Sequence, residues 1–256
     1  MNRLSRKIGF AIVAIVVPVS LSTATIFAAP ATTTRTTAFC TNLPSTISKV
    51  NSSLSNLQSK LTTAWNNRNA QIATNDTKWD QALAADRAKW AAQRQNEFTE
   101  LQAKATTDAQ KAAVQTYITA LSDAINSRES ANDQARATFR SGLTSLLASQ
   151  QSTINSQVAT FTGTVNAAEA TAQSSCAATP SDTSIRTTFV SATRTARSAY
   201  NSDRKSDSGI GTQVKALAAT RDAAIKANDT AFAATAKAEA TALKAAFAGT
   251  GTNVSG

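Results

Sequence analysis

The stretch LPSTISKVNSSLSNLQSKL at residues 43–61 opens the segment that decides the fold. Its apolar residues recur every three or four positions, which is the spacing of one face of an α-helix. The segment continues to Cys176 with no proline after Pro44 and only two glycines, Gly142 and Gly163. We therefore expect two long amphipathic helices folded back on each other over residues 43–176. Pro44 would lie in the first turn, where its missing N–H costs nothing, and the two glycines would mark close helix approaches.

The turn between the two helices is expected near residue 108. Residues 106–108 interrupt the strong helix formers, and Thr107 with Gln110 has the pattern of a capping box. An antiparallel pair that turns there brings together residues whose numbers add to about 215–216. Cys40 and Cys176 obey this rule, which places both cysteines at the open end of the hairpin. The alternative is one continuous helix through residue 107, which would leave its apolar stripe in water.

A third helical arm is predicted over residues 183–248. The linker 177–182 contains Pro180, and Ser181 or Asp182 is expected to cap the arm. The arm is expected to be kinked or split near residues 206–211. The fold class is therefore all-α, an elongated antiparallel bundle of three long arms. The alternative folds residues 212–248 back to make a short four-helix end.

The two ends of the chain have a different composition from the helical arms. Residues 1–31 have a basic start, an apolar stretch and an Ala-Pro-Ala site, which is the pattern of a secretory signal peptide. An uncleaved N-terminal membrane anchor is the alternative interpretation. Residues 32–42 are interpreted as a Thr-rich tether, and residues 249–256 as a flexible tail.

The sequence offers few residues for catalysis. It contains no histidine, which removes the commonest general base and the commonest metal ligand. It has no Gly-rich phosphate loop, nucleophile elbow or C-x-x-C pair. We therefore expect no catalytic residues, no metal or cofactor site, and no small-molecule substrate.

Cys40 and Cys176 are the only cysteines. A reactive thiol with its resolving partner is one interpretation, but an exported chain with two cysteines favours a structural disulfide. Such a bond would close a loop of 136 residues between the two positions. On the chain-entropy treatment it would contribute roughly 4–5 kcal/mol to stability.

Two further groups of side chains could bind ligands. Arg186, Arg197 and Arg204 fall within about 20° of one another on a helical wheel at 100° per residue, with Arg194 beside them. This basic stripe could contact a polyanion, and its other interpretation is a solvated helix face. Three tryptophans share the apolar stripe of the first helix, where core packing is favoured over a ligand-stacking ladder; they are Trp65, Trp79 and Trp90.

The segments Phe39-Cys40-Thr41-Asn42-Leu43-Pro44 and Arg221-Asp222-Ala223-Ala224-Ile225-Lys226 resemble exported helical, coiled-coil-like proteins of ultrasmall candidate-phylum bacteria. The resemblance covers most of the chain after the N-terminal segment and implies no activity. Periplasmic chaperones of the Skp type are also basic, exported and helical. They build on a trimerising β-core, for which this sequence has no strand segment.

The net charge of +10 permits contact with anionic surfaces. We expect an exported, extracytoplasmic, non-enzymatic helical scaffold that binds a protein partner or an anionic envelope polymer. The alternatives are an extracytoplasmic holdase chaperone and a polyanion- or nucleic-acid-binding protein. Contact with a membrane is expected only through an uncleaved N-terminal segment. The oligomeric state is left open.

Overall fold

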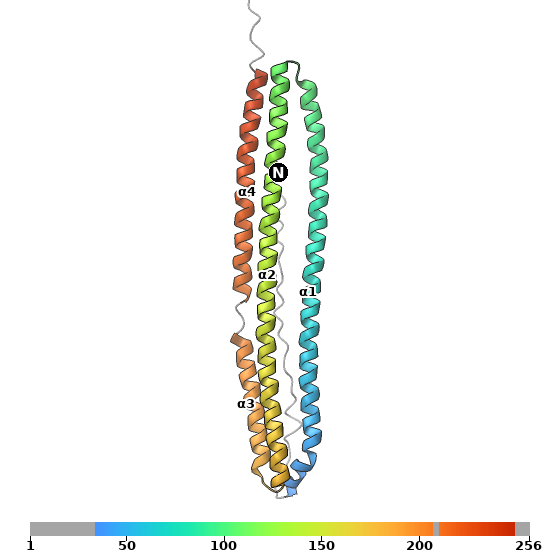
Figure 1. Ribbon diagram of the computed structural model, residues 1–256, viewed down its shortest axis with the longest axis vertical. Helices are drawn as coiled ribbons and strands as arrows, with labels where there is room; N and C mark the ends of the chain where they lie inside the picture. Colours follow the sequence, from blue (N-terminus) through green and yellow to red (C-terminus); the bar gives the residue numbers. More distant parts are fainter. Residues whose placement is uncertain (1–33, 207–209, 249–256) are drawn as a thin grey trace, which may run out of the picture. The chain divides into compact units, whose positions relative to one another are not determined.

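The computed structural model describes residues 34–206 and 210–248, which form four helices and contain no strand (Figure 1). They are α1 (Thr34–Lys104), α2 (Asp108–Ala178), α3 (Ser184–Ser206) and α4 (Ile210–Ala248). The all-α prediction is therefore confirmed, and so is the division of the third arm near residues 206–211. The segments interpreted as a signal peptide or anchor (1–31) and as a tail (249–256) lie outside the described residues.

The start of α1 differs from the prediction. The helix begins at Thr34, so residues 34–42 are helical and are not a tether, and Pro44 lies inside the helix. An interior proline removes the hydrogen bond to the carbonyl four residues earlier and costs about 3 kcal/mol. Packing on both sides of the proline offsets this cost, because Leu43 is 2% exposed and Phe39 contacts the Phe189 ring at 6.1 Å.

The predicted helix caps are present. The Gln110 backbone N–H donates to Thr107 Oγ1 at 3.2 Å, and the Thr107 N–H donates to Gln110 Oε1 at the same distance. This capping box satisfies N–H groups at the start of α2 and ends the turn between α1 and α2. Asp182, one of the two predicted caps of α3, accepts the Ser184 N–H at 2.8 Å through Oδ1.

The described helices belong to two compact units. Unit 1 comprises Met1–Gln71 with Leu147–Gly211, and unit 2 comprises Ile72–Leu146 with Thr212–Gly256. The described part of unit 1 contains the first part of α1, the last part of α2, and α3. The described part of unit 2 contains the rest of α1 and of α2, and nearly all of α4.

The core of unit 1 is closed by a disulfide between Cys40 and Cys176, whose Cα atoms are 5.4 Å apart. This confirms the predicted bond. The disulfide packs against a cluster that draws on all three helices, including Leu43, Ala172 and Ile185. The apolar spacing of α3 predicts a core-facing stripe of five residues. Four of them are buried and Ala192 is half-buried; the buried ones are Ile185, Phe189, Ala196 and Tyr200.

The core of unit 2 is thinner. In α4 only Val214 is buried among the residues described. Gly142 of α2 lies under Leu217 of α4, where an added Cβ would be 2.9 Å from Leu217 Cδ2. The predicted close approach is thus confirmed at Gly142, but it is wrong at Gly163, where a Cβ would meet nothing within 4 Å.

Contacts in both units obey the predicted register of the α1–α2 pair. In each of the following pairs the residue numbers add to 215 or 216: Cys40–Cys176, Asp76–Arg140, Arg87–Glu129 and Phe98–Tyr117. The two helices are therefore antiparallel and turn near residue 108, as the cysteine positions predict. A continuous helix through residue 107 is excluded, because α1 ends at Lys104.

The third arm contacts α2 in each unit. Tyr200 of α3 stacks on Phe161 of α2 with ring centroids 5.3 Å apart. Within unit 2, Arg221 and Phe232 of α4 contact Phe139 and Arg128 of α2. Since α4 packs on an earlier part of α2 than α3 does, the four-helix end considered as an alternative is not formed.

Candidate functional site

The positive charge of the chain is concentrated in unit 1. Its residues 34–71 and 147–206 contain nine Lys or Arg and three Asp or Glu, a net charge of +6. Residues 72–146 and 212–248 of unit 2 contain fourteen basic and twelve acidic residues, a net charge of +2. The α1 segment 34–71 has four basic residues and no acidic one. A surface with such an excess of one sign attracts ions of the opposite sign.

The four predicted arginines all lie on α3. Arg194 is exposed, and Arg186, Arg197 and Arg204 are half-buried. Lys205 follows them and is exposed, as are Lys49 and Lys60 on α1. Lys49 and Lys60 are eleven residues apart, close to three full helical turns, so they share one face of α1. This lysine pair was not singled out from the sequence, although the absence of acids from residues 34–71 was a visible signal.

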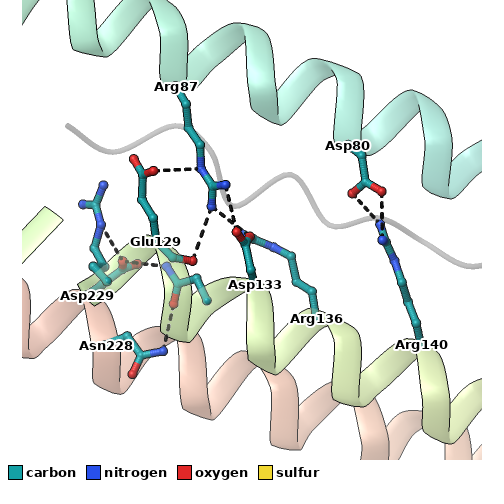
Figure 2. A network of polar contacts seen from close by, with 10 residues as sticks. Asp80, Arg87, Glu129, Asp133, Arg136, Arg140, Asn228 and Asp229 are labelled. Carbon is teal, nitrogen blue, oxygen red and sulfur yellow. Dashed lines mark hydrogen bonds and ion pairs between the residues drawn. The ribbon is translucent and has the colours of Figure 1, made fainter. Parts of the chain in front are cut away.

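In unit 2 the charges are paired with one another. Figure 2 shows Arg87 of α1 reaching two carboxylates of α2. Its Nη2 lies 2.8 Å from Asp133 Oδ1, and its Nε lies 3.3 Å from Glu129 Oε2. In the same view Arg140 of α2 forms a bidentate pair with Asp80 of α1, at 2.8 and 2.9 Å.

These pairs shift the acid–base equilibria of their members. The hydrogen bond from Arg140 lowers the pKa of Asp80, and the hydrogen bond from Arg87 lowers the pKa of Asp133. The same bonds raise the pKa values of Arg87 and Arg140. All four groups therefore stay charged at neutral pH, and they act as ion-pair partners between α1 and α2.

Arginines of α2 also stack on aromatic rings of both neighbouring helices. The Arg136 guanidinium lies 4.4 Å from the centre of the Trp79 ring on α1. The Arg128 guanidinium lies 4.3 Å from the centre of the Phe232 ring on α4. Burial lowers the pKa of Arg136, and its ion pair with Asp133 opposes that shift.

The predicted packing of the three tryptophans holds only in part. Trp65 is 1% exposed and lies in the core of unit 1, and Trp79 is half-buried beneath Arg136. Trp90 is 44% exposed, so the prediction that it packs in the core is wrong. The physical reason is the thin core of unit 2. From Ile72 onward, most residues of the apolar stripe of α1 are only half-buried.

One carboxylate of unit 1 is buried. Glu169 of α2 is 6% exposed, and its Oε2 accepts the Asn51 Nδ2–H at 3.4 Å. Its Oε1 has no hydrogen-bond partner within the described part of the chain. Burial raises the pKa of Glu169, and the Asn51 hydrogen bond opposes that shift. A buried carboxyl with one unpaired oxygen destabilises the fold when it is charged.

Two hollows lie among the described residues, one in each unit. An open groove of about 490 Å³ in unit 2 is lined by Arg87, Glu129 and Asp133, whose charges are already paired. A hollow of about 330 Å³ in unit 1 is lined largely by alanines and threonines of α2 and by Phe189 and Ile185 of α3. Across residues 34–206 and 210–248 no three or more acidic or cysteine side chains gather in a metal-binding arrangement.

Within the same described ranges, no helix has the length and hydropathy needed to cross a bilayer. Comparison of the chain with protein-family models, with curated proteins and with solved structures finds no match.

Proposed function

We propose that this protein is an exported, non-enzymatic helical scaffold that binds an anionic polymer of the cell envelope through unit 1. The observation that carries the proposal is the uneven charge, +6 on residues 34–71 and 147–206 against +2 on the corresponding residues of unit 2. Export is supported by the signal-like sequence at residues 1–31 and by the disulfide between Cys40 and Cys176.

The exposed basic side chains of unit 1 are the expected contacts. They are Lys49, Lys60, Arg194 and Lys205. The half-buried arginines of α3 lie on the same helix as Arg194 and add to the positive charge of that helix. A polymer with repeated phosphate groups fits such a surface, since each neutralised phosphate releases a bound counterion.

The test is a comparison of two variants that lose the same charge. One variant replaces Lys49, Lys60, Arg194 and Lys205 with Gln, and the other replaces four exposed lysines of α4: Lys215, Lys226, Lys237 and Lys244. Binding of poly(glycerol phosphate) is measured over a range of salt concentrations. For a flexible single-stranded polyanion we expect log K to fall with log salt at a slope of about −0.7 per contact.

The unit 1 variant should bind more weakly and with a shallower salt slope, whereas the α4 variant should keep the slope of the wild type. Equal losses in the two variants would show that the net charge alone matters and would overturn the assignment to unit 1. The remaining alternative is a protein partner, which cross-linking on intact cells tests. Recovery of one specific protein instead of polymer would favour that alternative.

A further inference from the structure

The hollow of unit 1 lies between α2 and α3 and has a volume of about 330 Å³. This volume is near the lower limit of the roughly 300–1,000 Å³ that small-molecule sites occupy. Its floor is the apolar core of the unit, since Ala172, Ile185 and Phe189 line it and are 4% exposed or less. Its walls contain five hydroxyl groups and one carboxylate; they belong to Thr164, Thr171, Ser175, Ser184, Thr188 and Asp182.

The polar groups of the walls whose hydrogen bonds are fixed offer acceptors to a ligand. Thr164 and Thr171 donate their hydroxyl protons to the carbonyls four residues earlier in α2, at 2.9 Å each. Each hydroxyl oxygen keeps lone pairs for a second partner. Asp182 accepts the Ser184 N–H through Oδ1 at 2.8 Å, and this bond lowers the pKa of the carboxyl, so it is ionised at neutral pH. A ligand of this hollow must therefore supply hydrogen-bond donors.

The charge around the hollow disfavours an anionic ligand. Among the described residues that line it, Asp182 is the only charged one. The basic stripe of α3 lies on another side of the helix, because Arg186 and Arg197 are about 160° and 180° around it from Thr188 at 100° per residue. The hollow is thus separate from the arginines assigned to polymer binding.

The surface of α2 that continues from the hollow is uncharged. Between Arg140 and the end of α2 at Ala178 the only charged residue is Glu169, which is 6% exposed. In place of charges this stretch has pairs of hydroxyl residues four positions apart, repeated every eleven residues, which is about 16.5 Å along a helix. We call these six residues the hydroxyl row; they are Ser149 with Thr153, Thr160 with Thr164, and Thr171 with Ser175.

The hydroxyl row leads into the hollow. Thr153 and Thr164 donate to the carbonyls of the first residues of their pairs, at 3.1 and 2.9 Å. The last three residues of the row line the hollow itself. A ligand longer than the hollow would therefore meet the same kind of acceptor along α2.

We propose that the hollow binds one sugar unit of a neutral glycan, and that the glycan continues along the hydroxyl row. Sugar hydroxyls supply the donors that the walls require, and the C–H groups of a sugar ring fit the apolar floor. A neutral glycan also avoids repulsion from Asp182. The proposal goes beyond the polymer binding proposed above and does not depend on it, because the arginines of α3 lie on another side of that helix.

Binding of immobilised neutral hexasaccharides by the full-length protein tests the proposal. The probes are hexamers of glucose, mannose, galactose and N-acetylglucosamine. We expect the wild type to bind at least one of them. Failure to bind any of the four at millimolar concentration would overturn the proposal, whatever the result with poly(glycerol phosphate).

A matched pair of variants places the binding in the hollow. Thr171→Tyr fills the hollow from its α2 wall, and Thr138→Tyr makes the same change at an exposed position three repeats earlier, in unit 2. Thr171→Tyr should weaken glycan binding at least tenfold and leave poly(glycerol phosphate) binding unchanged, whereas Thr138→Tyr should alter neither. Equal losses of glycan binding in the two variants would refute the assignment. If Thr171→Tyr melts at a lower temperature, Thr188→Tyr fills the hollow from the α3 wall.

Smaller changes test the chemistry of the walls. Thr164→Val and Thr171→Val each remove one acceptor and should weaken glycan binding by about threefold to tenfold. A glucosamine hexamer provides an ammonium group as an alternative donor. If it binds more tightly than every neutral hexamer, and if Asp182→Asn abolishes that advantage, the hollow selects a cation and the proposal of a neutral glycan is wrong.

Discussion

Gly142 of α2 and Leu217 of α4 are in such close contact that a β-carbon on Gly142 would force the Leu217 side chain to shift. A Cβ on Gly142 would lie 2.9 and 3.0 Å from the two Leu217 methyl groups. At Gly163, on the same helix, a Cβ would meet nothing within 4 Å. The two glycines therefore have different roles in one helix.

The glycine pair gives a matched prediction. Gly163→Ala should stabilise the protein by about 1 kcal/mol through helix propensity. Gly142→Ala should lose most of that gain, because the Leu217 side chain must shift. Denaturant titration measures both. In a Leu217→Ala background the gain at Gly142 should return, and its failure to return would show that the close contact is not the cause.

Neutralising the buried carboxyl of unit 1 should stabilise the protein. Glu169→Gln keeps an oxygen for Asn51 and removes a buried charge. The folded-state pKa of Glu169 is raised above its unfolded value. The penalty for charge therefore applies above the folded pKa and disappears as the pH falls toward about 4. We expect a gain of about 1 kcal/mol at pH 7, measured by thermal unfolding from pH 4 to 8.

The control for this variant is Glu100→Gln, which changes an exposed glutamate of α1. It should change stability by less than about 0.5 kcal/mol. A Glu169→Gln gain that stays constant down to pH 4 would contradict the assignment to the buried carboxylate.

The contribution of the unit 2 carboxylates to stability should change with pH in the opposite sense to that of Glu169. The pKa values of Asp80 and Asp133 are lowered in the folded state by their arginine hydrogen bonds. Their contribution is present above the unfolded pKa of about 3.9 and is lost as the pH falls through the lower folded values. The double variant Asp80→Asn with Asp133→Asn should therefore be less stable than the wild type at pH 6. The difference should shrink below pH 4.

Denaturant midpoints at pH 6, 4 and 3 measure this effect. Because both side chains are about half exposed, the effect of each pair should stay near the range of about 0–1 kcal/mol expected at a surface. A difference that persists unchanged at pH 3 would show that charge is not the cause.

Removal of the disulfide should cost far more than any of these changes. Cys40→Ser with Cys176→Ser opens a loop with a sequence separation of 136 residues. The chain-entropy treatment gives a loss of roughly 4–5 kcal/mol. Calorimetry of the wild type with and without reductant provides the comparison. Identical melting in both conditions, or two free thiols in the protein isolated without reductant, would refute the bond.

Features that repeat locally in the sequence were predictable. The period of the apolar stripe, the capping box at Thr107 and Gln110, and the cysteine pair together predict the helical hairpin and its register. The start of α1 was not predictable in this way, because residues 34–42 have weak helix formers and precede Pro44. Their helical state depends on packing of Phe39 against a ring 150 positions later in the chain.

The candidate sites were predictable only in part. The arginines of α3 stand out by their spacing, but the charge contrast between the units depends on a division of the chain that only the contacts reveal. Likewise, Trp90 is 44% exposed in unit 2, where few residues are fully buried, and the apolar period of α1 does not disclose this.

The position of the disulfide also determines how the chain would transmit a pulling force. Tension applied between a residue before Cys40 and any residue of α3 passes through the sulfur–sulfur bond. Residues 41–175 lie outside that load path and need not unfold. Reduction of the bond would place the whole hairpin under load and add up to roughly 450 Å of extensible chain. Under tension the oxidised protein therefore extends little between these points, whereas the reduced protein can extend much further.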